Sequence, residues 1–147
     1  MVLKLYMLVE SRKKTRDLIA NDEGFIGSIY SDNRGHLTIG FGFNLESCEM
    51  PISVALEWLN IIINDIEISL SKVINFWENL NDARKYVLIN MAYQLGINGL
   101  LKFRDMLNKL GSKDYVGAAN EMKDSVWYRD YTTRASRLIK IMLYGEF

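Results

Sequence analysis

The sequence predicts a mainly helical α+β fold, in which a long helix joins a small lobe containing a β-hairpin to a helical C-terminal lobe. Three observations support this prediction. Pro51 is the only proline among 147 residues, and helix-compatible Met, Leu and Ile are frequent. Residues 25–43 are β-prone and punctuated by glycine. From Pro51 onward, apolar residues recur at three- and four-residue spacing, as they do on one face of a helix.

The N-terminal residues predict a first helix through Glu10–Ala20, with its end near residues 21–24. Residues 2–9 are apolar except for Lys4, and the pattern leaves open whether they extend this helix or form a separate strand. They are too few for a membrane helix, which needs about 20 residues, and no basic flank precedes them as in an export signal. We therefore expect synthesis in the cytoplasm and delivery to any outside substrate by another component.

The next segment predicts a β-hairpin. The β-prone runs Phe25–Tyr30 and Leu37–Phe43 flank the turn-forming residues 31–35, whose final glycine is expected to supply a positive φ. Gly40 and Gly42 are expected inside the second strand, where glycine weakens pairing unless something approaches the backbone closely. These two glycines are the first indication of function.

Helical patterns fill the rest of the chain. Pro51 and Ser53 mark the start of a long helix to about Val73, and Asn81 or Asp82 is expected to cap a second helix. Three further helices are expected, with Gly111 as a stop after the first of them: Leu100–Leu110, Asp114–Lys123 and Thr133–Leu143. We expect one domain over 1–147, with a small lobe at about 17–52, a connecting helix at about 53–73, a helical lobe at about 74–147 and an N-terminal extension, 1–16, of open packing.

Composition excludes several classes of protein. Eighteen basic and eighteen acidic residues give zero formal net charge, so no nucleic-acid partner is expected. The single Cys48 can form neither an internal disulfide nor a cysteine-based zinc site, and the single His36 leaves no histidine-based metal site. His36 itself is expected to be an exposed turn residue. We expect no metal, no cofactor and no membrane partner, and a monomer.

Two carboxyl groups are candidates for a catalytic pair. Glu23 is expected at the end of the first helix and Asp32 in the hairpin turn. Glycoside hydrolysis commonly uses two carboxyl groups, one that protonates the leaving oxygen and one that acts ionised on the other face of the sugar. On spacing alone the structural interpretation is favoured, because helix ends often carry Glu and turns often carry Asp.

Three blocks of sequence resemble one family. The first comprises residues 22–24 (DEG), Tyr30, Asp32, Gly35 and residues 38–42 (TIGFG), which resemble the active-site region of the phage-type lysozymes, or endolysins. That family's motif is Glu, eight residues, Asp, five residues, Thr. Two later blocks, residues 88–96 (LINMAYQLG) and residues 125–128 (SVWY) with 134–137 (RASR), resemble the C-terminal lobe of the T-even branch. Together they cover roughly residues 17–147 in order and imply a lysozyme-like fold.

The resemblance implies a muramidase that cleaves bacterial peptidoglycan between N-acetylmuramic acid and N-acetylglucosamine. Glu23 would be the general acid, while Asp32 and Thr38 would hold and activate a water on the opposite face, giving inversion. A carboxylic acid, a carboxylate and a hydroxyl suit these roles chemically. The protein would act on the wall in the periplasm after release, with a holin or another delivery system as its accessory.

The resemblance also implies supporting residues. Arg134 would pair with the catalytic glutamate and Arg137 would face Asp22, although both arginines also suit a plain surface helix. Further residues would contact the saccharide: Gly42 in the cleft, and Tyr93 and Gln94 at its mouth. Tyr93 suits a core aromatic equally well, and Trp127 and Tyr128 are expected mostly in the core.

Three features depart from the family pattern. Phe43 stands where the family commonly has a histidine, so that histidine's ion pair is missing. Val126 stands where the T-even enzymes have a cleft arginine. Zero net charge is unusual for proteins that act on anionic walls, and we expect weaker long-range attraction to the wall.

Two alternatives to an active lysozyme stay open. A lytic transglycosylase needs the acid but no water-positioning carboxylate, so Asp32 and Thr38 count against it. A non-catalytic wall-binding or assembly module would have no need of all three residues, but Phe43, Val126 and the neutral charge leave room for it.

Overall fold

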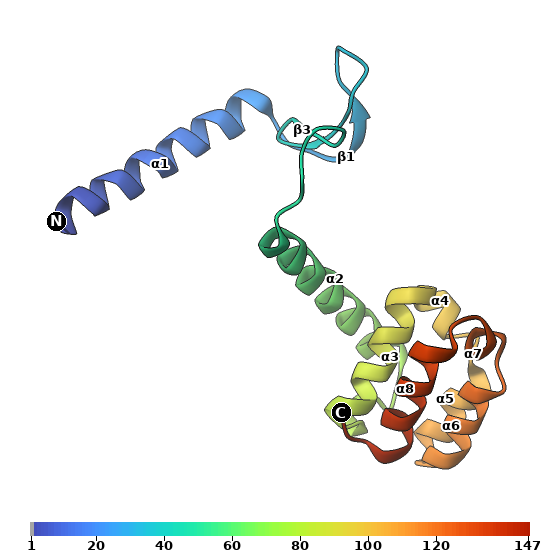
Figure 1. Cartoon of the computed structure of the whole chain (residues 1–147). Coiled ribbons are helices and arrows are strands. Elements are labelled where there is room, and N and C mark those ends of the chain that lie inside the picture. The colour runs from blue at the N-terminus through green and yellow to red at the C-terminus, as the bar shows by residue number, and fades with distance from the viewer. Residues whose placement is uncertain (1) are drawn as a thin grey trace. The chain divides into compact units, whose positions relative to one another are not determined.

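The computed structural model describes the backbone of residues 2–147 and the side chains of residues 9–147. The chain divides into two compact units, Met1–Ile52 and Ser53–Phe147. Helices dominate, and one small three-stranded antiparallel sheet lies in the first unit, which confirms the predicted α+β class (Figure 1). Among the described residues, no helix has the length and apolar character needed to cross a membrane.

The first unit begins with one continuous helix, α1 (Val2–Glu23). Residues 2–9 therefore extend the first helix rather than forming a strand. The helix ends where predicted: the amide of Gly24 donates to the carbonyl of Ala20 at 3.1 Å, and Gly24 has a φ of +69°. A left-handed glycine after the last helical residue is the common way for a helix to end.

The sheet has the order β1–β2–β3, with strands β1 (Ile26–Ser31), β2 (Leu37–Gly40) and β3 (Phe43–Asn44). The predicted hairpin is confirmed, with Tyr30 opposite Thr38 in the first pair of strands and Thr38 opposite Asn44 in the second. Gly35 has the positive φ, +88°, that the turn was expected to need.

The prediction of one strand through Phe43 is wrong. The chain turns at the end of β2, where Gly40, the last residue of the strand, and Gly42 have φ values of +71° and +77°, in the region that L side chains rarely adopt. Gly40 is thus in the second strand as predicted, at its last position, whereas Gly42 lies in the tight turn into β3, with Phe41 between the two glycines.

The second unit is entirely helical apart from its connections. Its elements are α2 (Ile52–Val73), the 3₁₀ turn η1 (Trp77–Asn79), α3 (Asp82–Leu95), α4 (Ile97–Leu100), α5 (Arg104–Gly111), α6 (Tyr115–Lys123), α7 (Val126–Asp130) and α8 (Thr132–Tyr144). The Asn81 side chain accepts from the amide of Arg84 at 3.0 Å, so the predicted cap of α3 is confirmed.

Two expectations about the helical unit are wrong. Residues 100–110 are not one helix, because α4 ends at Leu100 and α5 begins at Arg104. Gly111 lies inside α5, and the left-handed residue that follows the helix is Lys113, with a φ of +64°. Packing explains the glycine at this position instead, since a Cβ on residue 111 would come within 2.8 Å of the Phe76 ring.

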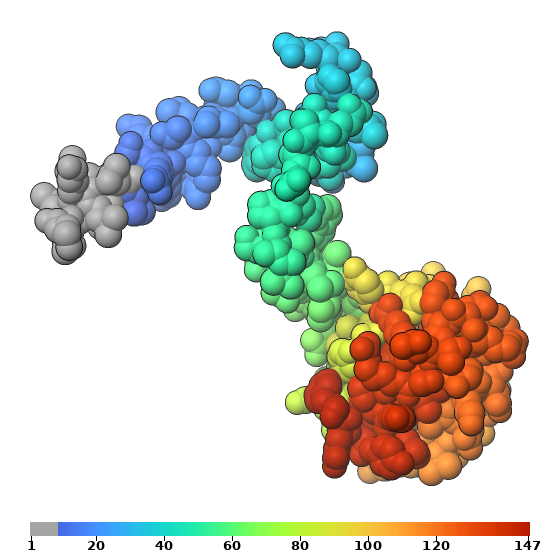
Figure 2. Space-filling view, in the orientation of Figure 1, coloured from blue at the N-terminus to red at the C-terminus, as the bar shows by residue number. Residues whose placement is uncertain are grey.

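The core lies in the second unit, whose side chains form one closely packed body from yellow to dark red (Figure 2). Its largest buried side chains are aliphatic residues and methionines from α2, α3, α4, α5, α6 and α8: Leu70, Leu88, Met91, Leu100, Met106, Leu110, Met122, Leu138 and Met142. Burial of each such side chain stabilises the fold by about 1.5–3 kcal/mol. Trp127 is 5% exposed, as expected of a core residue.

One buried cation joins the start of α3 to the end of α8. Arg84 is 8% exposed, and its guanidinium donates to the carbonyls of Met142 at 3.0 Å and Leu143 at 3.2 Å. The Asn81 amide donates to the carbonyl of Gly145 at 2.8 Å. The last carbonyls of a helix have no partner within the helix, and a cation there also complements the helix dipole. This cluster, Arg84 with Asn81, therefore caps α8.

Candidate active site

Glu23 is the last residue of α1, and its side chain is exposed. The turn between β2 and β3 lies against it, since a Cβ built on Gly42 would be 3.0 Å from Glu23 Oε2. Any side chain at position 42 would therefore press on this carboxylate. The sequence indicated that something approaches the backbone at Gly40 and Gly42. In the structure the ring of Phe43 approaches Gly40 and the carboxylate of Glu23 approaches Gly42.

Asp32 is held as an ionised carboxylate by the turn that it starts. Its Oδ1 accepts from the backbone amides of Arg34 at 2.8 Å and His36 at 2.9 Å. These hydrogen bonds, above all the one from His36, lower the pKa of Asp32 below its ordinary value of 3.8. Asp and Gly suit this turn because Asp can bond its own following backbone and Gly35 can take a positive φ.

Thr38 lies at the start of β2, one pair beyond the turn, and is 3% exposed. Its hydroxyl donates to the carbonyl of His36 at 3.1 Å. The same carbonyl accepts from the amide of Asp32 at 2.9 Å. Asp32 and Thr38 thus share hydrogen-bond partners on one residue, and the structure brings these two predicted site residues together.

The imidazole of His36 is not a plain exposed turn group. Its Nδ1 is 2.8 Å from Glu46 Oε2, and the two side chains are 44% and 53% exposed. The pKa of His36 is raised, first by the hydrogen bond that its ring donates to Glu46 and then by the negative charge of Glu46, and the same bond lowers the pKa of Glu46. Sequence reasoning missed this pair, because the two residues meet only through the register of β2 with β3.

A hollow of about 750 Å³ separates α1 from the turn between β2 and β3. Its apolar wall includes the rings of Phe41 and Phe43, which flank Gly42 and lie edge to face with centroids 6.5 Å apart. Arg12 and Arg16 of α1 also line it. Phe43, found where the family commonly has a histidine, is 56% exposed.

In the helical unit, Arg134 is held by Asn90. Its Nε donates to Asn90 Oδ1 at 2.7 Å, and its Nη2 donates to the carbonyl of Asn90 at 3.1 Å. The amide of Asn90 also donates to the Tyr86 hydroxyl at 3.1 Å. Asn90 lies in the second block of family resemblance, yet nothing in the sequence marked it as the partner of this arginine.

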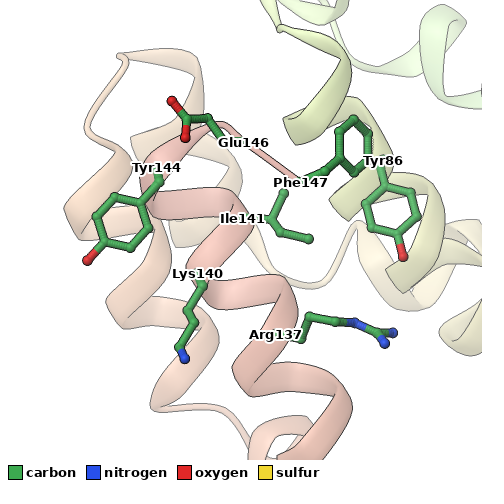
Figure 3. A pocket seen from close by; sticks show the side chains of 7 residues that line it. All are labelled: Tyr86, Arg137, Lys140, Ile141, Tyr144, Glu146 and Phe147. Atoms are coloured by element: carbon green, nitrogen blue, oxygen red, sulfur yellow. The ribbon is translucent and has the colours of Figure 1, made fainter.

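Three more predicted residues lie in the helical unit. Tyr93 is 50% exposed, so the core alternative is wrong. Gln94 Oε1 accepts from the indole of Trp127 at 3.0 Å, which leaves its amide nitrogen for other partners. Arg137 is exposed and borders an open hollow of about 510 Å³, together with Lys140 and the rings of Tyr86, Tyr144 and Phe147 (Figure 3).

Asp22, the predicted partner of Arg137, lies in the last turn of α1 with its side chain exposed. The roles of Asp22, Arg134 and Arg137 as ion-pair partners, and of Gly42, Tyr93 and Gln94 as substrate contacts, stay predictions. Within the described part of the chain, no three His, Cys, Asp or Glu side chains gather as a metal site would require.

Comparison with known proteins decides the family. The model of the family described as phage lysozyme matches residues 20–139, which include Glu23, Asp32, Thr38 and Arg134. The chain belongs to the phage lysozyme family. This is a family of muramidase-like peptidoglycan hydrolases, so membership implies peptidoglycan as the class of substrate.

Curated relatives of this phage lysozyme family member include two kinds of protein. It is 26% identical to probable T4-type lysozyme 1 of Dictyostelium discoideum, with 88% of this chain and 94% of that protein covered. A second Dictyostelium protein, probable T4-type lysozyme 2, is 25% identical over the same shares. The pre-baseplate central spike protein of Enterobacteria phage T4 is 30% identical over 88% of this chain but only 28% of its own length.

Proposed function

We propose that the protein is an N-acetylmuramidase that hydrolyses the β-1,4 bond between N-acetylmuramic acid and N-acetylglucosamine of peptidoglycan, with inversion. Glu23 is the general acid that protonates the leaving oxygen. Asp32 and Thr38 hold a water on the opposite face of the sugar, and Asp32 takes its proton as the water attacks.

The observation that carries this proposal is the shared anchoring of Asp32 and Thr38 on His36. A carboxylate and a hydroxyl whose positions are both fixed by one stretch of main chain are suited to orient one water. The lowered pKa of Asp32 supports its role, because an inverting mechanism needs this carboxylate ionised while the acid is protonated.

The position of Glu23 also suits a general acid. It is exposed at the end of α1, and the side-chain-free turn at Gly42 lies against its carboxylate. This turn leaves the carboxyl accessible to a leaving oxygen while limiting where it can move. The proposal further assigns Arg134 to Glu23 and Arg137 to Asp22 as ion-pair partners.

Digestion of purified peptidoglycan, with products identified by mass, tests the proposal. The wild type should release muropeptides with reducing ends, and NMR of early products should show the α anomer, because a β bond is cleaved with inversion. Anhydro products would instead indicate a lytic transglycosylase. Binding to the sacculus without products would indicate a wall-binding module.

Glu23→Gln is the decisive variant. It should lose hydrolysis while keeping the circular dichroism spectrum of the wild type. Glu10→Gln, on the same helix and equally exposed, is the matched control and should keep full activity. Hydrolysis that persists in Glu23→Gln would contradict the proposed role of this residue.

A further inference from the structure

We propose that His36, through its ion pair with Glu46, is a positioning residue that fixes Asp32 and Thr38 and makes hydrolysis depend on the charge of its imidazole. The inference rests on the proposed function, because it takes Asp32 and Thr38 as the groups that hold the water. It assigns a role to a residue pair that the motif of the family does not contain.

The first step is the main chain of His36. Its amide donates to Asp32 Oδ1 at 2.9 Å, and its carbonyl accepts from the Asp32 amide at 2.9 Å and from the Thr38 hydroxyl at 3.1 Å. Any movement of this one residue therefore moves the carboxylate and the hydroxyl together. A misplacement of catalytic groups by about 1 Å can lower a rate about 100-fold.

The second step is the side chain of His36, which ties the turn to the segment after β3. Its Nδ1 and Glu46 Oε2 are 2.8 Å apart. Glu46 is itself fixed, since its amide donates to Asn44 Oδ1 at 2.9 Å and Asn44 lies opposite Thr38 in the sheet. The ion pair thus links His36 in the turn, through Glu46 and Asn44, to the sheet at Thr38, whose hydroxyl bonds back to His36.

The third step is the charge of the ring. Glu46 faces the imidazole directly, and Asp32 also favours its charged form, so the pKa of His36 is raised. The pKa of Glu46 is lowered by the same contact. The ion pair is intact where Glu46 is ionised and His36 is protonated. It is lost as the pH rises through the raised pKa of His36, or falls through the lowered pKa of Glu46.

The experiment compares the pH profiles of wild type and Glu46→Gln. Both proteins share every pH dependence that does not involve Glu46, so the ratio of their kcat/KM values removes it. Where His36 is protonated and Glu46 is ionised, kcat/KM of the wild type should be roughly three- to ten-fold higher than that of Glu46→Gln. This is smaller than the full loss of rate that misplaced catalytic groups can cause. As His36 loses its proton, the ratio should fall to about one, because the ion pair is then absent from both proteins.

NMR supplies the matching titration. His36 is the only histidine of the chain, so its ring signals can be followed without assignment. The midpoint of the change in the rate ratio should coincide with the midpoint of the His36 titration in the wild type. In Glu46→Gln, the His36 midpoint should move down toward its ordinary value.

Two further variants separate positioning from general electrostatics. Glu49→Gln also removes one negative charge from the exposed segment between β3 and α2. The ratio of wild-type kcat/KM to that of Glu49→Gln should be constant across pH. His36→Lys keeps a positive charge at every pH tested, so it should exceed the wild type in rate above the His36 midpoint. A merely structural role would lower the rates of Glu46→Gln equally at all pH values.

The possible results test the inference and the proposed function separately. A rate ratio that is flat across pH, or an unchanged His36 midpoint in Glu46→Gln, overturns the inference. A wild type without hydrolytic activity overturns the proposed function instead. In that case exchange of the His36 backbone amide decides the positioning step, since it should be several-fold faster in Glu46→Gln, and an equal rate overturns it.

Discussion

Arg134 of α8 is fixed by Asn90 of α3 through two hydrogen bonds, one to its side-chain oxygen at 2.7 Å and one to its main-chain carbonyl at 3.1 Å. Two nitrogens of the guanidinium fork thus bind one residue. Lysine has no such fork and cannot replace it. The arginine predicted to support the catalytic acid is oriented by an uncharged amide, which leaves its positive charge uncompensated by this contact.

Removal of that amide should reduce both stability and activity. In Asn90→Ala, Arg134 loses the shorter of its two hydrogen bonds, and bonds to charged groups contribute about 1.5–3 kcal/mol. We expect a decrease of roughly this size in the free energy of unfolding, measured in urea, and a several-fold lower kcat. Asn98→Ala, an exposed position in the same unit, should change neither. Wild-type kcat in Asn90→Ala would mean that the orientation of Arg134 is unimportant for turnover.

Gly42→Ala should disturb Glu23 directly. The new Cβ would lie 3.0 Å from Glu23 Oε2, and a φ of +77° strains any L side chain. We expect a destabilisation of about 1 kcal/mol and a fall in kcat of roughly ten-fold or more. Gly96→Ala is the matched control, because its φ of +74° imposes equal strain while its Cβ meets nothing within 4 Å. Equal kcat losses in both variants would show that strain alone is responsible.

Asp32→Asn should lose most turnover without losing the turn. The asparagine oxygen can still accept from the amides of Arg34 and His36, but it cannot take a proton from water. A fall of about 10²–10⁴ in kcat is typical when such a group is removed. NMR spectra should show an intact hairpin. A rate near that of the wild type would make this carboxylate structural.

The acid side of the pH profile should report the same residue. The pKa of Asp32 is below 3.8, so its carboxylate stays ionised down to that pH and is lost only as the pH falls through the lower value. Because the folded-state pKa is depressed, the turn contributes its full stability above pH 3.8 and loses it below. The acid limb of kcat/KM, measured in Glu46→Gln so that Glu46 does not contribute, should therefore lie below pH 3.8, and a limb above it in that variant would contradict the role of Asp32.

Thr38 should tolerate serine but not valine. Serine keeps the hydroxyl that donates to the His36 carbonyl, whereas valine replaces it with a methyl group at a position that is 3% exposed. We expect kcat within a few-fold of wild type for Thr38→Ser and at least about ten-fold lower for Thr38→Val. Thermal unfolding serves as the check on folding. Equal activity in the two variants would remove the hydroxyl from the mechanism.

Arg84 should matter for stability and not for chemistry. Arg84→Met leaves two carbonyls at the end of α8 without a partner and removes the guanidinium from the Tyr115 ring, whose centroid is 3.5 Å away. We expect a loss of about 2–4 kcal/mol in the free energy of unfolding, and Arg84→Lys should restore only part of it. The protein that remains folded should have the kcat of the wild type.

Much of the fold follows from local signals in the sequence. Asn81 caps α3, Gly24 ends α1 and Gly35 makes the hairpin turn, each for a reason that depends on one or two neighbours. The errors arise where two structures share one pattern. A Gly-x-Gly segment suits both a weakened strand and a tight turn, and only the pairing of β3 with β2 decides between them.

The candidate site divides in the same way. Glu23, Asp32 and Thr38 could be found from the sequence because the family motif is defined by the number of residues between them. The contacts of Asn90 with Arg134 and of His36 with Glu46 could not be predicted from the sequence. The first pair is separated by 44 positions and the second by 10, so each pair meets only after helices pack or strands pair. Sequence therefore locates the reacting groups more readily than the groups that orient them.

The cap that Arg84 and Asn81 form on α8 also bears on how the protein is made. The acceptors of these side chains, from Met142 to Gly145, lie about sixty residues after Asn81 and Arg84 in the chain and are synthesised later by that number of residues. Closing a loop of that length is entropically costly, and nothing made earlier supplies the same carbonyls. The helical unit should therefore complete its folding only after residues 142–145 have emerged from the ribosome, which favours folding of the unit in one step over stepwise growth from α2 onward.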